Sequence, residues 1–310
     1  MDYKARMEHI SNIIDRAVHQ EQTPITTGIK FLDNRIGGYF PGELTTICGG
    51  ENCCKTAFVI RQLCHIAVDQ GIPTLVVQTN MSEYIFLASM AAYYCCIDTD
   101  CVQQVLNAEE HRENVEHFLD KLRRSPIFFV SSDAYEDKTF FGELEKIISD
   151  NGIKIAFVDE AIRSESEERK KGYVCHLKRL AMKMNIPVVA TFCVNVIEDD
   201  EISKSRSLEY LWFFGDFHGS DVVIGFRHLE QDWIHYDERV KDLHGMIGLE
   251  ILKYRGLTIE SKTKIPVGHF YFRDFNKWQK QHLEKLRQSN KGRIDALISR
   301  LGLVVADGPM

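Results

Sequence analysis

The sequence predicts an α/β protein with a twisted, mostly parallel central sheet, helices on both faces and antiparallel strands towards the C-terminal end. Short apolar segments alternate with amphipathic segments between residues 43 and 195, which is the pattern of repeated βαβ units. Their apolar runs are nearly continuous, as expected for strands that are covered on both faces. After residue 220, strand-like segments follow with little helix between them, so we expect antiparallel pairing there.

The elements follow one another in a regular order. A strand at 43–50 leads into a glycine loop, and a helix is expected at 55–71. Further strands are expected at 74–79, 126–131, 153–161, 187–195, 220–228, 246–256 and 268–275, and further helices at 82–96, 109–124, 140–152 and 172–186. These elements define one domain over residues 25–276.

Two flanking segments complete the chain. Residues 1–24 comprise a helix and a polar linker, because apolar residues recur at helical spacing within 3–18. A short amphipathic helix of this kind either folds back on its own domain or docks on a neighbouring subunit. Residues 277–310 are charged and weakly helical.

Composition limits the classes of function. The chain has 310 residues and a formal net charge of -7, so any nucleic-acid binding must come from a local basic patch. Its nine cysteines lack zinc-site spacing, which favours reduced thiols in a cytoplasmic protein. The N-terminus has no apolar signal core, and no apolar run is long enough to span a membrane.

The segment CGGENCCKT contains the clearest candidate for chemistry. It follows an apolar strand and opens a helix, which is the setting of a phosphate-binding loop for ATP or another NTP. Lys55 would reach the outer phosphates, and the hydroxyl of Thr56 would contact Mg²⁺. The alternative is an ordinary strand–turn–helix that contains Lys-Thr. The loop residues are Gly49, Gly50, Glu51, Asn52, Cys53, Cys54, Lys55 and Thr56.

A carboxylate ends a later strand. Asp159 closes the apolar run IKIAFVD, where a carboxylate commonly meets Mg²⁺ in nucleotide-binding sheets. Glu160 follows it and would be a candidate base for an attacking water. The alternative for Asp159 is a loop or helix-capping carboxylate.

The run TTGIKFLDNRIGGYFPGELTTICGG resembles the start of the ATPase domain of DnaB-type replicative helicases. The resemblance continues in order through TLVVQTNMS, LKRLAMKMNIPVVATFCVN and EILKYRG, and covers roughly residues 5–276. It implies a RecA-like P-loop NTPase fold and rings, usually hexamers, that draw single-stranded DNA through the centre. It also implies that Lys253 and Arg255 act in trans on a neighbour's nucleotide, and that residues 3–18 dock on the adjacent subunit. From the resemblance we expect this sequence to lack the family's N-terminal primase-binding domain.

Three positions depart from the family pattern. The final glycine of the phosphate loop is Cys54, the catalytic glutamate is Asn80, and the glutamine that senses the γ-phosphate is Cys193. Loss of a general base typically costs about 10²–10⁴ in rate. Glu160, or less favourably Glu83, is a candidate replacement. Two functions therefore remain open: a ring motor on single-stranded DNA with weakened hydrolysis, or a non-hydrolysing paralogue that serves in regulation or assembly.

Two charged segments, 163–172 and 198–207, correspond to the family's DNA-binding loops. Acidic residues interrupt both segments, so the alternative is a solvated charge run. The candidate phosphate contacts are Arg169, Lys170, Lys171, Lys204 and Arg206.

Overall fold

A computed structural model describes residues 10–11, 23–50, 53–97, 102–131, 139–161, 167–193, 217, 219–228, 246–255, 257–268 and 271–272. Its strands are β1 Leu44–Gly49, β2 Thr74–Gln78, β3 Ile127–Ser131, β4 Ile155–Asp159, β5 Val188–Cys193, β6 Val222–His228, β7 Met246–Tyr254, β8 Leu257–Gly268 and β9 Tyr271–Phe272. Its α-helices include α2 Lys30–Ile36, α3 Lys55–Leu63, α4 Glu83–Tyr94, α5 Arg112–Arg123, α6 Phe140–Asp150 and α7 Glu167–Met184. Between them lie the π-helix η1 Cys64–Asp69 and the 3-10 helices η2 Val102–Asn107 and η3 Glu109–His111.

The strands form a single sheet in the order β3-β2-β4-β5-β1-β6-β7-β8-β9. Neighbouring strands from β3 to β6 in that order run parallel. The pairs β6–β7, β7–β8 and β8–β9 are antiparallel. The predicted fold class is therefore confirmed, including the change to antiparallel pairing towards the C-terminal end.

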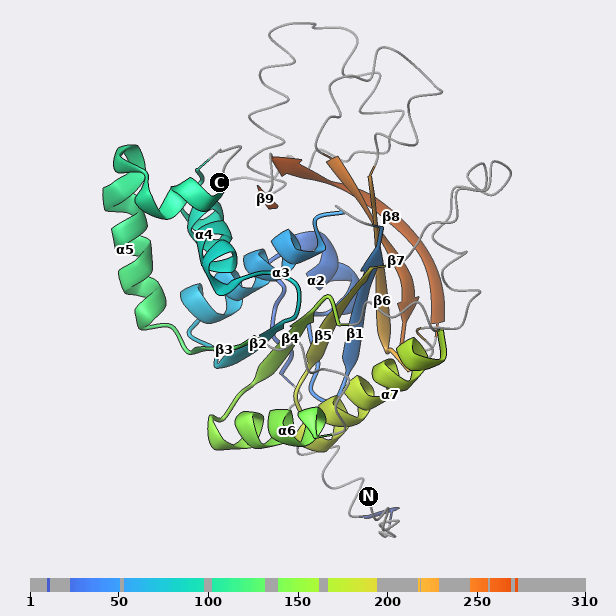
Figure 1. Cartoon of the computed structure of the whole chain (residues 1–310). Coiled ribbons are helices and arrows are strands. Elements are labelled where there is room, and N and C mark those ends of the chain that lie inside the picture. The colour runs from blue at the N-terminus through green and yellow to red at the C-terminus, as the bar shows by residue number, and fades with distance from the viewer. Residues whose placement is uncertain are drawn as a thin grey trace, which may run out of the picture.

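Helices cover both faces of the parallel part of the sheet (Figure 1). One apolar cluster joins the sheet to α2, α3, α4 and α5, with Leu32, Phe58, Phe86 and Phe118 among its buried members. A second cluster lies on the opposite face, where Leu144 of α6 and Leu177 of α7 are buried. Every residue of β1, β2 and β4 is buried, which explains why their sequences are apolar runs.

Several elements differ from the sequence-based prediction. The helix expected at 55–71 changes at residue 64 from α to π geometry. Helix α2, which ends at Gly37 with a positive φ of 76°, was not predicted. Strand β8 was also missed, because LTIESKTKIPVG has few consecutive apolar residues.

Helix α7 begins at Glu167, five residues before the predicted start at Gly172. Arg169, Lys170 and Lys171 therefore belong to a helix, and the expectation that residues 163–172 form a loop was wrong for 167–172. The glycine suggested a boundary, but the preceding glutamate, arginine and lysine residues are good helix formers.

The expected flanking segments lie almost entirely outside the described residues; only 10–11 of the segment 3–18 are described, and they are helical. None of the helices in the described part of the chain is both long and apolar enough to cross a membrane.

Candidate nucleotide site

The phosphate-loop candidate lies between β1 and α3, at the edge of the sheet where the parallel strands end. Gly49 is the last residue of β1 and pairs with Cys193 of β5 and Phe226 of β6. A Cβ at Gly49 would lie 2.6 Å from the Phe226 carbonyl oxygen. Glycine is therefore required here by the packing of the sheet. Glu51 and Asn52 lie outside the described residues.

Cys54 directly precedes α3 and adopts a left-handed conformation, with φ 59° and ψ 26°. A non-glycine residue pays about 1–2 kcal/mol for this backbone geometry. This position therefore has the conformation that glycine adopts most easily. Burial, followed by the neighbouring Cys53, raises the pKa of the Cys54 thiol to about 11, so the thiol stays protonated at neutral pH.

Lys55 is the first residue of α3 and is only 5% exposed. Its Nζ donates to the carbonyl oxygens of Gly49 at 3.1 Å and Gly50 at 2.6 Å. No carboxylate forms an ion pair with it within the described ranges, and the first turn of α3 holds no acidic residue. A buried ammonium at a helix N-terminus without a carboxylate partner fits an anionic group such as a nucleotide phosphate.

Asp159 ends β4 and is fully buried. Its Oδ1 accepts from the Thr191 hydroxyl at 2.7 Å, and its Oδ2 accepts from Gln78 Nε2 at 2.9 Å. Both donors are neutral, so they orient the carboxylate without cancelling its charge. Where side chains are described, no group of three or more His, Cys, Asp and Glu residues could hold a metal ion. Asp159 would supply one carboxylate to Mg²⁺, which is commonly held by one or two carboxylates together with phosphates and waters. Thr56, partly exposed in the first turn of α3, would add its hydroxyl.

Glu160 also has a positive φ, of 50°. Its N–H donates to Thr191 Oγ1 at 2.7 Å, and its carbonyl accepts from Thr79 Oγ1 at 2.9 Å. Two hydroxyls from neighbouring strand ends thus fix the backbone of Glu160. Non-glycine residues persist in this conformation only where their surroundings determine it, and such positions cluster at functional sites.

Asn80 lies exposed just beyond β2, and its N–H donates to Gln78 Oε1 at 3.0 Å. Gln78 pairs with Asp159 across the sheet, so one side chain links Asp159 to Asn80. Gln78, Thr79 and Thr191 were missed by sequence reasoning. The signal for them was a polar residue at the end of each of two apolar strands, TLVVQT and PVVATFC.

The two other proposed catalytic residues lie elsewhere. Lys253 pairs with Val223, and Tyr254 pairs with Val222 at the start of β6. Arg255 follows Tyr254, and its N–H donates to the Asp221 carbonyl at 2.6 Å. These residues lie at the edge where the parallel strands begin, opposite the phosphate loop. Burial lowers the pKa of Lys253, and Lys178 adds to this while Asp221 opposes it.

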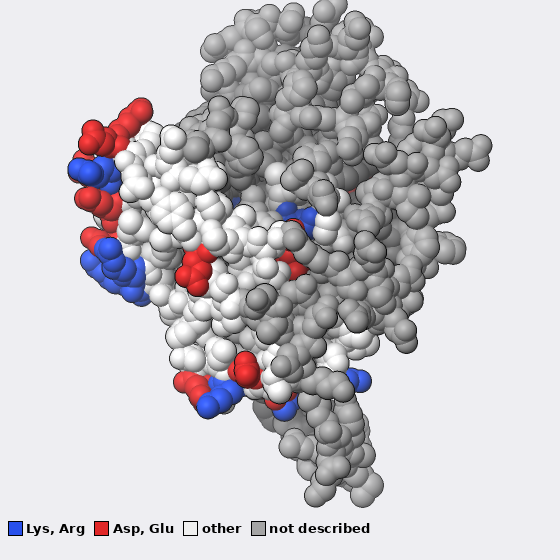
Figure 2. Space-filling model, in the orientation of Figure 1, with Lys and Arg blue, Asp and Glu red and all other residues white. Residues whose placement is uncertain are grey.

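A basic DNA-binding surface is not evident in the described part. On the face shown in Figure 2, charged side chains gather over α5, where acidic and basic residues mix. Side chains of Arg169, Lys170 and Lys171 are not among those described, and Lys204 and Arg206 lie outside the described residues.

The family model of the DnaB-like helicase C-terminal domain matches residues 24–202, which is more than half of the chain. The chain belongs to this family. A DnaB replicative helicase from Treponema pallidum is 23% identical over 173 residues, which is 54% of this chain and 40% of that protein. The chain therefore spans well under two thirds of that relative. The DNA repair and recombination protein RadB from Thermococcus kodakarensis is 27% identical, covering 58% of this chain and 74% of that protein.

Solved structures support the same fold for this DnaB-like chain. An ATPase domain of known structure superposes with a TM-score of 0.68 at 14% identity, covering 86% of this chain and 96% of that one. A DnaB-like replicative helicase, described with its primase interactions, gives a TM-score of 0.62 at 14% identity, covering 87% of this chain and 67% of that one. The RecA-like fold expected from the resemblance is thus confirmed.

Proposed function

We propose that this chain is an NTP-binding DnaB-like ring protein that moves on single-stranded DNA, with hydrolysis weakened by Cys54, Asn80 and Cys193. Lys55, Thr56 and Asp159 would bind ATP or another NTP with Mg²⁺. One observation carries the proposal. Lys55, Thr56 and Asp159 lie where the parallel strands end, whereas Lys253 and Arg255 lie where those strands begin.

Under this proposal, the separation divides each nucleotide site between two subunits. Strand β1 runs from Leu44 to Gly49, and at about 3.3 Å per residue its ends lie roughly 16 Å apart. Arg255 lies beside the start of β1, farther from the phosphate loop of its own chain than an arginine side chain extends. A nucleotide contact by Lys253 or Arg255 would therefore be made to another copy. Head-to-tail contacts of this kind give rings when the rotation between subunits closes and open filaments when it does not, and the proposal is the closed ring.

Residues 3–18 would strengthen such a ring by docking on the adjacent subunit. The number of subunits is taken as six from the family resemblance. A cytoplasmic location is proposed because the cysteines are expected to be reduced. Single-stranded DNA is the proposed substrate because relatives of this chain include a replicative DNA helicase. Arg169, Lys170, Lys171, Lys204 and Arg206 are the proposed phosphate contacts.

Glu160 is the proposed general base. An amide at Asn80 does not accept a proton from water at neutral pH, whereas the carboxylate of Glu160 does. Two hydrogen bonds hold the Glu160 backbone next to Asp159, at the edge where the nucleotide would bind.

A second function is favoured by the same site: a non-hydrolysing paralogue that binds nucleotide and serves in regulation or assembly. The left-handed Cys54 and the absence of a carboxylate at Asn80 both favour slow turnover.

The test is steady-state ATP hydrolysis with and without single-stranded DNA, with ATP binding measured on the same samples. Lys55→Ala is the control. DNA-stimulated turnover that Lys55→Ala removes is expected for the motor. Lys55-dependent binding without turnover would favour the paralogue, and the absence of both would overturn the proposal.

A further inference from the structure

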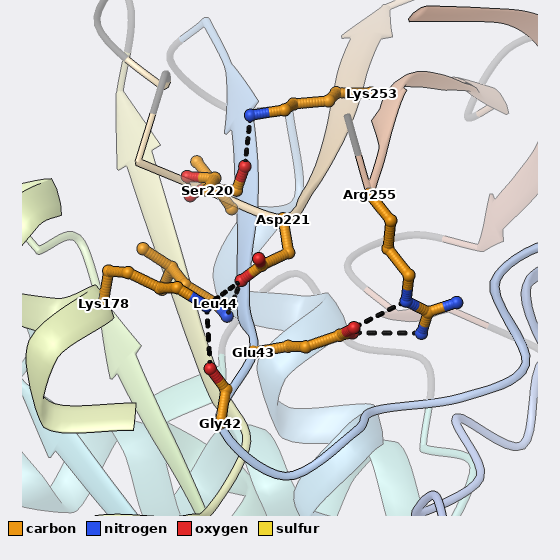
Figure 3. Close-up of polar contacts among 9 residues, drawn as sticks. Gly42, Glu43, Leu44, Lys178, Ser220, Asp221, Lys253 and Arg255 are labelled. Carbon is orange, nitrogen blue, oxygen red and sulfur yellow. Dashed lines mark hydrogen bonds and ion pairs between the residues drawn. The ribbon is translucent and has the colours of Figure 1, made fainter. Parts of the chain in front are cut away.

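Arg255 is held by its own chain in a bidentate ion pair. Its Nε donates to Glu43 Oε1 at 2.5 Å, and its Nη2 donates to Glu43 Oε2 at 3.0 Å (Figure 3). Paired, parallel hydrogen bonds are the strongest arrangement between a guanidinium and a carboxylate. Burial works against ionisation of Arg255, but the hydrogen bond and charge of Glu43 outweigh it, so the pKa of Arg255 is raised.

Three further residues contact the guanidinium of Arg255. Nη2 also donates to the Ile36 carbonyl at 3.2 Å, and Nη1 donates to the Tyr254 hydroxyl. The guanidinium carbon lies 4.3 Å from the Phe40 ring centroid and 4.4 Å from the Tyr254 ring centroid. Most of the N–H groups of Arg255 are therefore engaged by the chain itself, and its charge faces a carboxylate.

Hydrogen bonds hold the backbone on both sides of the Glu43 side chain. Glu43 directly precedes β1, and its carbonyl accepts from Val188 N at 3.0 Å. The next residue, Leu44, donates its N–H to Asp221 Oδ2 at 2.8 Å, and Lys178 donates to the same oxygen at 2.7 Å. Figure 3 shows this Lys178–Asp221 pair directly beside Glu43. Because these hydrogen bonds fix the backbone around Glu43, we expect release of Arg255 to involve side-chain movement rather than movement of the Glu43 backbone.

We propose that Glu43 restrains Arg255 within its own subunit, so that the arginine reaches a neighbour's nucleotide only by exchanging this carboxylate for a phosphate. The inference rests on the proposed function, because it presumes nucleotide at the subunit boundary. Carboxylate and phosphate recognise the same guanidinium edge, so one arginine satisfies one of them at a time. Glu43 is thus a positioning residue that makes nucleotide binding weaker than the site would otherwise allow.

Two measurements on the full chain test the restraint. The first is the rate at which phenylglyoxal modifies Arg255 in nucleotide-free protein, read by mass spectrometry. The second is the affinity for a fluorescent, non-hydrolysable ATP analogue with Mg²⁺. The variant is Glu43→Gln, which keeps the shape of the side chain and removes its charge. Glu145→Gln is the matched control, because Glu145 is an ion-paired glutamate of similar exposure, 27% against 20% for Glu43.

For Glu43→Gln we expect about three- to tenfold faster modification of Arg255 and a similar gain in nucleotide affinity, since a charge-assisted pair is replaced by a neutral one. Glu145→Gln should match the wild type in both measurements. The affinity gain should vanish in the double variant Glu43→Gln/Arg255→Ala. Glu43→Asp, which keeps the charge on a shorter side chain, should shift both readouts in the same direction by less, and it serves if Glu43→Gln does not fold.

Other results would overturn the inference. Unchanged modification of Arg255 in Glu43→Gln would show that Glu43 does not restrain it. Lys55-dependent nucleotide binding that is insensitive to Glu43, or a gain that persists without Arg255, would overturn the restraint while leaving the proposed function standing. No nucleotide binding by any variant would overturn both.

Discussion

The hydroxyl of Thr191 donates to Asp159 Oδ1 over 2.7 Å and accepts the N–H of Glu160 over the same distance. One side chain on β5 thus positions both the proposed metal-binding carboxylate and the proposed base. All three groups lie at the edge of the sheet where the parallel strands end.

Thr191→Val should destabilise the protein. The change leaves a buried carboxylate oxygen and a backbone N–H each without this hydrogen bond, and such losses cost about 1–3 kcal/mol each. Urea unfolding followed by circular dichroism would measure the loss. Thr191→Ser keeps the hydroxyl and should retain most of the stability; equal losses in the two variants would show that the methyl group, and not the hydrogen bonds, matters.

Cys54→Gly should increase nucleotide affinity several-fold. Glycine removes the Cβ from the loop that would surround the phosphates. It also adopts the left-handed conformation without the cost of about 1–2 kcal/mol that a side chain brings, but it gives the unfolded chain more freedom, so stability should change little. Isothermal titration with an ATP analogue and Mg²⁺ is the measurement. Cys54→Ala removes only the thiol and should bind like the wild type; a gain as large in Cys54→Ala would assign the effect to sulfur.

Glu160→Gln should lower the rate of ATP hydrolysis by about 10²-fold or more, because the amide removes the proposed base. Nucleotide affinity should stay close to that of the wild type. Single-turnover hydrolysis separates the two quantities. Glu83→Gln, at the start of α4, is the matched control, and a loss confined to Glu83→Gln would transfer the role to that residue.

The raised pKa of Cys54, about 11, predicts slow alkylation of this thiol at pH 8. The thiolate is the reactive form, so the rate should rise about tenfold for each pH unit between 8 and 10 while the protein stays folded. Mass spectrometry after iodoacetamide treatment would read each cysteine separately. Cys96 is exposed and provides the reference. Alkylation of Cys54 at pH 8 as fast as that of Cys96 would contradict the burial of its thiol.

Sequence reasoning found the elements that local pattern determines. The apolar runs of β1, β2 and β4 and the loop before Lys55 were placed from periodicity and motif. It also indicated that Asp159 ends its strand. It did not find that Gln78 and Thr191 bond to this carboxylate, because the partners come from three strands far apart in the chain.

The Arg255–Glu43 ion pair could not be predicted from the sequence for the same reason. The two residues lie 212 positions apart, and only the pairing of β6 with both β1 and β7 brings them together. Nothing in the sequence indicated that Glu160 and Arg255 share positive φ angles with Cys54, since neither is a residue type that favours that conformation.

Lys55 lies where the parallel strands end and Arg255 lies where they begin. This placement has a genetic consequence. Under the proposed arrangement, each composite site takes its phosphate loop from one chain and its arginine from another. Lys55→Ala and Arg255→Ala chains would each be inactive alone, yet a mixture would contain boundaries that join an intact loop to an intact arginine. The two defects would complement each other in mixed assemblies, as two lesions within one chain's own site would not.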